Sequence, residues 1–331
     1  MEVTKTVLSI LTSFILSIII GYTIIPKLKK LNVSQRISRF VEDMHKKKDG
    51  TPTMGGIIFI IPPILIITTM ILLKKIYITY NLLIVIETLI SFAFIGFIDD
   101  YLIVKKHNNK GLSKEQKFLL QVISSIIFFY LFLKAGNETL IWIKLFNIKI
   151  KLGWIYGILI LFLLTATSNA VNITDGLDGL AAGLSVIAYT TFGIICWKSG
   201  WLEGYQEIAI LCFLIVGGLL GFLIFNSNPA KIFMGDTGSL SLGATLGAIA
   251  ILTRYEFLLI LIGIVFVIET LSCIIQIIYY KTTKKRLFPM TPIHHSFEKK
   301  GWKEIDIVKL FWIVGLIASM LALTIIKWKN I

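Results

Sequence analysis

The chain has 331 residues, of which 56% are apolar and 16% are charged. A soluble protein of this length carries about 25% charged residues and commonly divides into two domains. Here apolar runs of about 20 residues recur along the whole sequence, and each is long enough to cross a bilayer core. The composition therefore excludes a soluble enzyme, a secreted disulfide scaffold and a disordered linker.

The net charge and the cysteines agree with a membrane protein. A net charge of +14 is typical of loops that face anionic lipid, so we expect no nucleic-acid partner. Cys196, Cys212 and Cys273 all lie inside apolar runs and form no CxxC pair. They are predicted to be small buried side chains, not disulfides or zinc ligands.

Ten apolar segments are expected to cross the membrane as helices. The first is too long for a signal peptide and has no small-residue cleavage site before Pro26, so it is expected to remain as an anchor. In chain order the predicted spans are 5–25, 56–73, 77–98, 118–134, 153–170, 178–197, 206–225, 239–253, 257–280 and 307–327. No internal repeat is found, and residues 1–331 are predicted to form a single integral membrane domain.

One segment between the fourth and fifth spans follows a different pattern. Residues 139–152 alternate partly between apolar and polar around Phe146 and Asn147, which predicts a short β-hairpin. Of the 33 Lys and Arg residues, 22 fall in or beside the loops that follow odd-numbered spans. The positive-inside rule puts those loops in the cytoplasm, and both termini and the hairpin on the outer side. The expected fold is thus an all-α polytopic membrane protein with about ten transmembrane helices, an extracytoplasmic β-hairpin and cytoplasmic active-site loops.

The aspartates gather on one side of this topology. All eight lie at or near the cytoplasmic face, and five are expected where a span meets a short loop: Asp99, Asp100, Asp175, Asp178 and Asp236. Ionisable groups at that depth are costly unless they are paired or bind something. Helix capping explains any one of them, but not five that converge from three loops. Carboxylates at a membrane–water boundary suit Mg²⁺, which there is typical of diphosphate chemistry.

Two familiar acidic motifs are excluded. The DDxxD motif of soluble prenyl transferases would need Asp where the chain has Ile103, and a calcium loop would need Glu where it has Gly183 or Val186. The paired glycines of NITDGLDGL leave room for a phosphate to approach the backbone. Asn169 and Asn172, one helical turn apart, offer amides to a nucleobase or ribose, or alternatively hydrogen bonds between helices.

Five sequence blocks then occur in order: KKKDGTPTMGG (46–56), FIDDY (97–101), NAVNITDGLDGLAAG (169–183), NSNPAKIFMGDTGS (226–239) and PIHHSFEKKGW (292–302). Over nearly the full chain they resemble the phospho-N-acetylmuramoyl-pentapeptide transferases, a branch of the polyprenyl-phosphate N-acetylhexosamine-1-phosphate transferase superfamily. The DD, NxxDGxDGL and MGDTGS blocks resemble the wider superfamily. GTPTMGG and PIHH.FE with GW resemble the muramoyl branch.

The resemblance implies a reaction and its participants. UDP-MurNAc-pentapeptide and undecaprenyl phosphate would give lipid I and UMP, the first membrane step of peptidoglycan synthesis. The resemblance also implies Mg²⁺ as cofactor, a multi-pass protein of the bacterial plasma membrane, an active site on its cytoplasmic face and a homodimer.

The resemblance also assigns residues. Asp236 matches the principal Mg²⁺ ligand, with Asp175 as a second metal and catalytic position, and Asp99 and Asp100 match an acidic pair at the attacking lipid phosphate. Phe233 matches an aromatic residue that stacks on uracil. The residues expected to bind substrate are Lys48, Lys106, Lys117, Asn169, Asn172, Asp178, Phe233, Gly235, His294 and His295.

The chain departs from the family pattern at two positions. Many members continue the acidic pair as DDxxK, but position 103 is Ile, so Lys105 or Lys106 would have to supply that charge. The third His of the common HHH triplet is Ser296, which can donate a hydrogen bond but carries no charge. Glu87 and Glu269 lie deeper in predicted spans and are expected to be structural partners of polar groups.

The expected chemistry is displacement at the β-phosphorus of a UDP-sugar by a lipid phosphate oxygen. Two mechanisms remain open. In the first, the lipid phosphate attacks directly and Asp99 accepts its proton. In the second, an aspartate first forms a covalent intermediate; direct attack is favoured because it makes fewer demands on the residues of the site. Two other functions also remain open. One is a GlcNAc-1-phosphate transferase of the same superfamily, and the other is a transporter or lipid flippase, which would place its ionisable groups nearer mid-bilayer.

Overall fold

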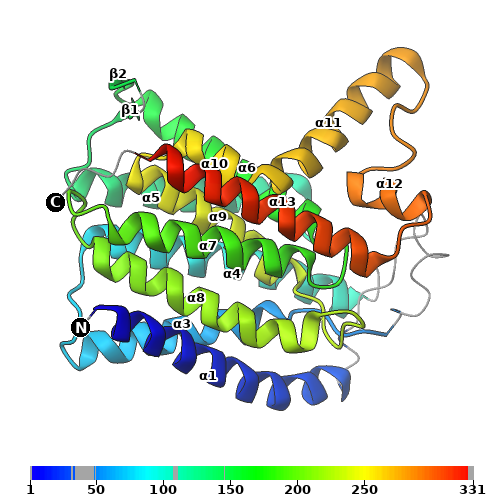
Figure 1. The fold of residues 1–331 in the computed structure, drawn as a ribbon, viewed down its shortest axis with the longest axis horizontal. Helices are drawn as coiled ribbons and strands as arrows, with labels where there is room; N and C mark the ends of the chain where they lie inside the picture. Colours follow the sequence, from blue (N-terminus) through cyan, green and yellow to red (C-terminus); the bar gives the residue numbers. More distant parts are fainter. Residues whose placement is uncertain are drawn as a thin grey trace.

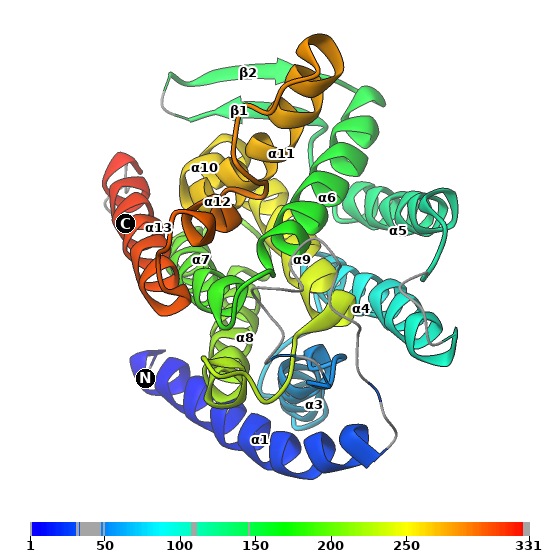
Figure 2. The same ribbon diagram turned by 90° about the vertical axis from the view of Figure 1, so that its right-hand side faces the viewer.

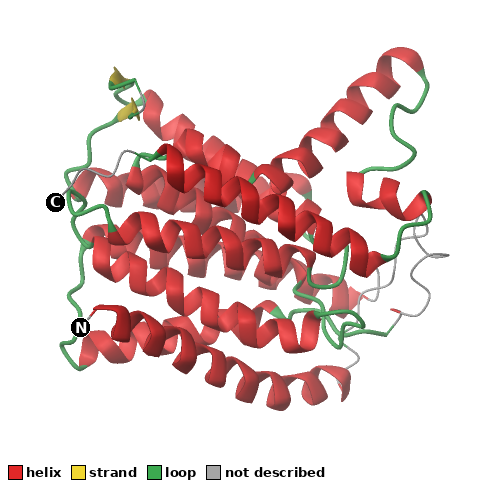
Figure 3. Ribbon diagram, in the orientation of Figure 1, coloured by secondary structure: helices red, strands yellow, loops and turns green. Residues whose placement is uncertain are grey.

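Long helices that run roughly side by side make up most of the protein (Figures 1 and 3). The structure is a computed structural model that describes residues 2–30, 33, 48, 50–106, 111–144 and 146–326. In chain order its elements are α1 (Glu2–Lys30), α3 (Gly56–Leu72), α4 (Tyr80–Lys106), α5 (Lys114–Lys134), β1 (Leu140–Ile143), β2 (Ile148–Lys151), α6 (Ile155–Thr174), α7 (Leu180–Trp197), α8 (Tyr205–Asn226), α9 (Gly235–Thr253), α10 (Glu256–Ile262), α11 (Ile264–Thr283), α12 (Ile293–Lys299) and α13 (Glu304–Ile325).

The predicted membrane architecture is confirmed in its class. Each expected span coincides with a helix, and eight helices of the described chain are long and apolar enough to cross a membrane. The α3 helix is shorter, with 17 residues. The protein is therefore a helical multi-pass membrane protein with only a small two-stranded sheet in its described part.

Helix α9 occupies the middle of the bundle (Figure 2). Its sequence, GDTGSLSLGATLGAIAILT, is rich in small residues, and every position from Thr237 to Thr253 is buried. Small side chains let helix backbones approach closely where lipid provides no hydrophobic drive between helices. Helices α4 and α6 make the most extensive contacts with α9. This packing sets the position of Asp236, which stands in the first turn of α9.

Among the helix boundaries that differ from the predicted ones, three change the description of the fold most. Helix α1 continues through Pro26 to Lys30, and α4 continues beyond residue 98 to Lys106. Asp99 and Asp100 therefore lie within a helix and not at the start of a loop, because packing against α9 supports the helix past the end of the apolar run. The ninth predicted span is interrupted at Gly263, where α10 ends and α11 begins. Helix α11 then leaves the bundle at an angle (Figure 1).

The predicted β-hairpin is present. Strands β1 and β2 pair antiparallel, with Ile143 opposite Ile148 and Leu140 opposite Lys151. The hairpin is tied to the far end of α9 by the buried Arg254. Its guanidinium donates to the carbonyl oxygens of Leu140 at 2.9 Å and Glu138 at 2.6 Å.

Candidate active site

Four aspartates from three separate parts of the chain lie together at the N-terminal end of α9, the end away from the β-hairpin. Asp99 and Asp100 come from α4, Asp175 directly follows α6, and Asp236 lies in the first turn of α9. The expectation that these acids meet on one face is confirmed by the contacts described next.

Lys117 joins two of these carboxylates. Its ammonium lies 2.7 Å from Asp236 Oδ2 and 3.2 Å from Asp99 Oδ1. The Asp99 Oδ1 atom also accepts a hydrogen bond from the Leu112 amide at 2.9 Å. The Lys117 side chain is 23% exposed, so the cation is partly open to a ligand. The lysine in contact with the acids is thus Lys117, from the first turn of α5.

Asp100 has a different environment from Asp99. It accepts hydrogen bonds from the Asp236 amide at 3.1 Å, the Thr237 amide at 3.0 Å and the Thr237 hydroxyl at 2.7 Å. A carboxylate at this position accepts hydrogen bonds from amides at the start of α9 and is stabilised by the positive end of the helix dipole. Adjacent residues on a helix point about 100° apart, which separates the two aspartates. Asp100 therefore positions the first turn of α9, while Asp99 faces Lys117.

Asn172 holds the other oxygen of Asp236. Its amide nitrogen donates to Asp236 Oδ1 at 2.7 Å and to the Ser239 hydroxyl at 2.9 Å. Asn169, one turn earlier, donates to the carbonyl oxygen of Thr165 in its own helix at 2.7 Å. The two amides that the sequence placed together are therefore separated, and only Asn172 contacts the carboxylate cluster.

The loop before α9 is paired with the loop before α3. The Phe233 amide donates to the Pro52 carbonyl oxygen at 2.8 Å, and the Gly55 amide donates to the Phe233 carbonyl oxygen at 2.9 Å. Gly235 has a φ of +72°, and a Cβ atom there would lie 2.5 Å from Asp100 Oδ2. Only glycine fits this turn. The GTPTMGG and MGDTGS blocks thus form one local structure, which leaves the Phe233 side chain half-buried.

A second charged group surrounds Lys48. Its ammonium lies 2.8 Å from Asp178 Oδ1 and 2.6 Å from Glu304 Oε1. Asn228 donates to both of these acids, at 3.1 Å in each case. Lys48 and Asp178 were predicted from the sequence, whereas Glu304 and Asn228 were not. The signals that could have indicated them are the NSNP run and the acid two residues after Trp302, at the first residue of α13.

Asp175 has a strongly perturbed acidity. Burial, followed by the nearby carboxylates of Asp236, Asp100 and Asp178, raises the pKa of Asp175 to about 7, and Lys48 opposes this shift. The neighbouring carboxylates thus disfavour a further negative charge on Asp175, and a bound cation would offset this repulsion.

Pro289 and Pro292 precede the histidine pair and predict an irregular loop there, because proline breaks a helix, and this prediction is wrong. His294 and His295 lie in the short helix α12, which begins directly after Pro292. The His294 ring is fully buried with Nδ1 3.1 Å from Glu269 Oε2, whereas His295 Nδ1 lies 2.6 Å from Glu298 Oε2. Because neighbouring helix residues diverge, the two rings point to different partners. The expected pairing of Glu269 with a polar group is confirmed.

Ser296, in place of the third histidine, is part of the local backbone structure. Its hydroxyl donates to the Met290 carbonyl oxygen and accepts from the Met290 amide at 3.2 Å. It is buried, so its hydrogen bonds are used within the protein.

The remaining predicted lysine lies outside the cluster. Lys106 is exposed in the last turn of α4, about 10 Å along the helix axis from Asp99. Lys105 lies over the Tyr101 ring, 5.9 Å from its centroid. Neither takes the position of the lysine in the DDxxK pattern, and Lys117 is the cation held by the carboxylates.

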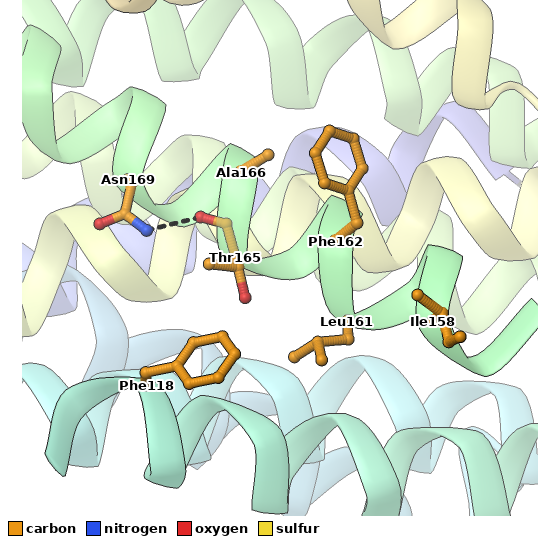
Figure 4. Close-up of a pocket in the computed structure, with 7 residues that line it drawn as sticks. All are labelled: Phe118, Ile158, Leu161, Phe162, Thr165, Ala166 and Asn169. Carbon is orange, nitrogen blue, oxygen red and sulfur yellow. Dashed lines mark hydrogen bonds between the residues drawn. The ribbon is translucent and has the colours of Figure 1, made fainter. Parts of the chain in front are cut away.

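Two cavities are lined in part by residues predicted to bind substrate, Asn169 in one and His295 in the other. One, of about 320 Å³, lies between α5 and α6 and is almost wholly apolar (Figure 4); it is lined by Phe118, Ile158, Leu161, Phe162, Thr165, Ala166 and Asn169. The other, of about 630 Å³, lies between α11 and α12 and includes the cationic side chains Lys281, Arg286 and Lys299 beside His295. The apolar groove thus adjoins the residue after Lys117, and the cationic pocket includes the ring of His295.

The oxygen donors fit a hard divalent cation. No group of three His, Cys, Asp or Glu side chains is arranged around one metal position in the part of the chain that the structure describes. The carboxylates of Asp236 and Asp175 would fill two coordination positions of Mg²⁺ and leave the others to water and substrate phosphate oxygens. Mg²⁺ is usually bound in this way, by one or two carboxylates with water and phosphate.

Known proteins resemble the chain over almost its whole length. The glycosyl transferase family 4 model matches residues 82–254, and signature 1 of the phospho-N-acetylmuramoyl-pentapeptide-transferases matches residues 48–60. The transferase of that name from Geobacillus sp. (strain WCH70) is 44% identical over 326 residues, covering 97% of this chain and 98% of the relative. The one from Listeria monocytogenes serotype 4b (strain CLIP80459) is 48% identical over 317 residues, covering 95% and 96%.

Proposed function

Because this chain belongs to the phospho-N-acetylmuramoyl-pentapeptide-transferase family, within glycosyl transferase family 4, we propose that the carboxylate cluster around Asp236 is its active site. The protein transfers phospho-MurNAc-pentapeptide from UDP-MurNAc-pentapeptide to undecaprenyl phosphate, giving lipid I and UMP. The observation that carries the site assignment is the arrangement of Asp236. Asp100 and Asn172 hold it from α4 and α6, and Lys117 links it to Asp99.

The two substrates explain why cations and anions alternate in this site. Both the lipid phosphate and the UDP-sugar are anionic, so catalysis requires charge neutralisation and alignment more than covalent help. Lys117 and Lys48 each lie against carboxylates now, and an arriving phosphate can take the place of one carboxylate partner. Exchange of one anion for another costs less than bringing a phosphate to an unpaired, desolvated site.

Mg²⁺ is the proposed cofactor, held by Asp236 and Asp175. When bound, it would neutralise the diphosphate and the UMP leaving group. Asp236 already points both oxygens toward cationic or donor groups, and Asp175 has a raised pKa that a divalent cation would lower.

The surroundings suggest where each substrate lies. The apolar groove between α5 and α6 begins one residue from Lys117, at Phe118, so it suits the lipid chain with its phosphate at Lys117. Asp99, 3.2 Å from Lys117, is then placed to accept the phosphate proton before direct attack. The Lys48 group suits the nucleotide, and the cationic pocket beside His295 suits the acidic groups of the donor peptide.

A membrane assay tests this function. Purified protein in lipid is given UDP-MurNAc-pentapeptide and undecaprenyl phosphate, and UMP release is followed with and without Mg²⁺. We expect UMP and lipid I to form together only when Mg²⁺ and both substrates are present. Release of UMP from UDP-GlcNAc instead would identify the sister activity, and Mg²⁺-independent turnover would remove the cofactor from the proposal.

The proposed orientation predicts a labelling pattern. The active site is assigned to the cytoplasmic face of the bacterial plasma membrane, where the donor nucleotide is made, and the hairpin to the outer face. A cysteine at Asn147, in the hairpin turn, should react with a membrane-impermeant maleimide added to intact cells, whereas one at Lys114, at the start of α5, should react only after lysis. The native cysteines are buried or half-buried, so the unsubstituted protein provides the background. The reverse pattern would place the active site outside.

The raised pKa of Asp175 predicts that the stability of the metal-free protein depends on pH. Its folded-state pKa of about 7 lies above the ordinary value of 3.8, so the folded state binds more protons than the unfolded state between these values. Stability must therefore fall as pH rises through this range. We expect the melting temperature to drop between about pH 4 and pH 7, and the Asp175→Asn substitution to flatten this slope.

Asp306→Asn is the matched control for this measurement, because Asp306 is an exposed acid at the same end of the protein. It should leave the slope unchanged. If Asp175→Asn and wild type lose stability equally with pH, Asp175 does not carry the excess charge.

A further inference from the structure

Glu269 is a buried acid that the proposed chemistry does not use. It lies in α11 with no exposed surface, and its Oε2 atom is 3.1 Å from His294 Nδ1, which is equally buried. Among the described residues neither Glu269 carboxylate oxygen has a hydrogen-bond partner of regular geometry. A carboxylate in this setting costs several kcal/mol unless a cationic or donor group compensates for it. The His294 ring is the group in a position to do so.

The opposite side of the same ring meets the catalytic loop. A Cβ atom added to Gly176 would lie 2.4 Å from His294 Nε2, so the ring packs directly on the backbone between Asp175 and Asp178. Both nitrogens of the His294 ring are buried, and neither has a hydrogen-bond partner of regular geometry among the described residues. One imidazole thus connects an acid in α11 with the loop that carries two aspartates of the site.

We propose that Glu269 is a positioning residue that orients His294, so that Nε2 faces the 175–178 loop and the diphosphate or sugar of the donor bound there. This inference rests on the proposed function. An ionised carboxylate can only accept hydrogen bonds, so the proposed role requires a proton on Nδ1 and leaves Nε2 for the ligand. Burial makes separation of the pair costly, which holds the ring in one orientation.

A purely structural role would have a different consequence. If Glu269 only joins α11 to α12, its loss should reduce stability and the amount of folded protein without changing how the folded enzyme uses its donor. If it acts through His294, its loss should change donor kinetics in protein that remains folded, and should add nothing once His294 is already replaced.

A double-mutant cycle separates these outcomes. We expect Glu269→Gln and His294→Gln each to lower kcat/KM for UDP-MurNAc-pentapeptide by about 10- to 100-fold, and the double variant to be within about 2-fold of His294→Gln. The KM for undecaprenyl phosphate and the Mg²⁺ concentration for half-maximal rate should stay within about 2-fold of wild type. Glu87→Gln is the matched control, because Glu87 is also an intramembrane acid, in α4, and it accepts from Ser124 at 3.1 Å. It should behave as wild type.

Independent effects that multiply in the double variant would overturn the proposal, as would a loss explained wholly by a lower melting temperature. A second readout does not depend on turnover. The chain has four histidines, so ¹⁵N-histidine NMR of the protein in lipid can assign His294 by its substitution. The His294 signals should report Nδ1 protonation in wild type and change in Glu269→Gln. If wild type lacks turnover but shows this signature, the proposed function fails while the Glu269–His294 contact stands; if the signature is the same in wild type and Glu269→Gln, the positioning role fails.

Discussion

Replacing Asp236 by asparagine is expected to lower the turnover rate by at least about 1,000-fold while the protein stays folded in the membrane. Asparagine keeps the volume of the side chain, and its one carbonyl oxygen can still accept from either Asn172 or Lys117, which contact the two Asp236 oxygens at 2.7 Å. What it removes is the negative charge that a divalent cation requires. The loss should therefore appear in the chemical step and not in membrane insertion.

The measurement is UMP release across a Mg²⁺ titration, combined with a melting curve of the purified variant. Asp306→Asn, which removes an exposed acid from the first turn of α13, controls for the change in net charge and should retain wild-type activity. Turnover of Asp236→Asn near the wild-type rate, with an unaltered Mg²⁺ requirement, would move the metal to other ligands.

Replacing Lys117 by methionine should cost about 100- to 1,000-fold in kcat/KM for undecaprenyl phosphate. Methionine preserves most of the packing of the lysine stem but leaves Asp99 and Asp236 without the cation that lies between them. The like charges then repel each other, and the lipid phosphate loses its counter-charge. Lys117→Arg should recover part of the activity, because the charge is kept while the geometry changes.

Lys105→Met is the matched control, because Lys105 follows the same DD pair but lies over Tyr101. It should change kcat/KM by no more than about 2-fold. If Lys105→Met loses as much as Lys117→Met, the acceptor phosphate is held at the end of α4 and not at the start of α5.

Some features followed from local sequence alone. Run length and hydropathy predicted the helical membrane class, because a bilayer imposes its thickness on each span separately. The two-residue period around Asn147 predicted the hairpin in the same local way. The five ordered blocks from 46–56 to 292–302 indicated the family, because each block is a run of contiguous residues that can be compared without knowing the fold.

Tertiary structure decided how those residues are used. Asp99 and Asp100 are neighbours in sequence, yet one contacts Lys117 and the other the start of α9, because α4 continues as a helix and packs on α9. Hydropathy could not predict that Lys48 would meet Glu304, 256 residues later, or that His294 would meet Glu269 inside the protein. Local sequence determines which segments enter the membrane and what chemistry each one carries. Which charges meet depends on the packing of distant helices, because a buried charge is stable only beside the partner that the fold brings to it.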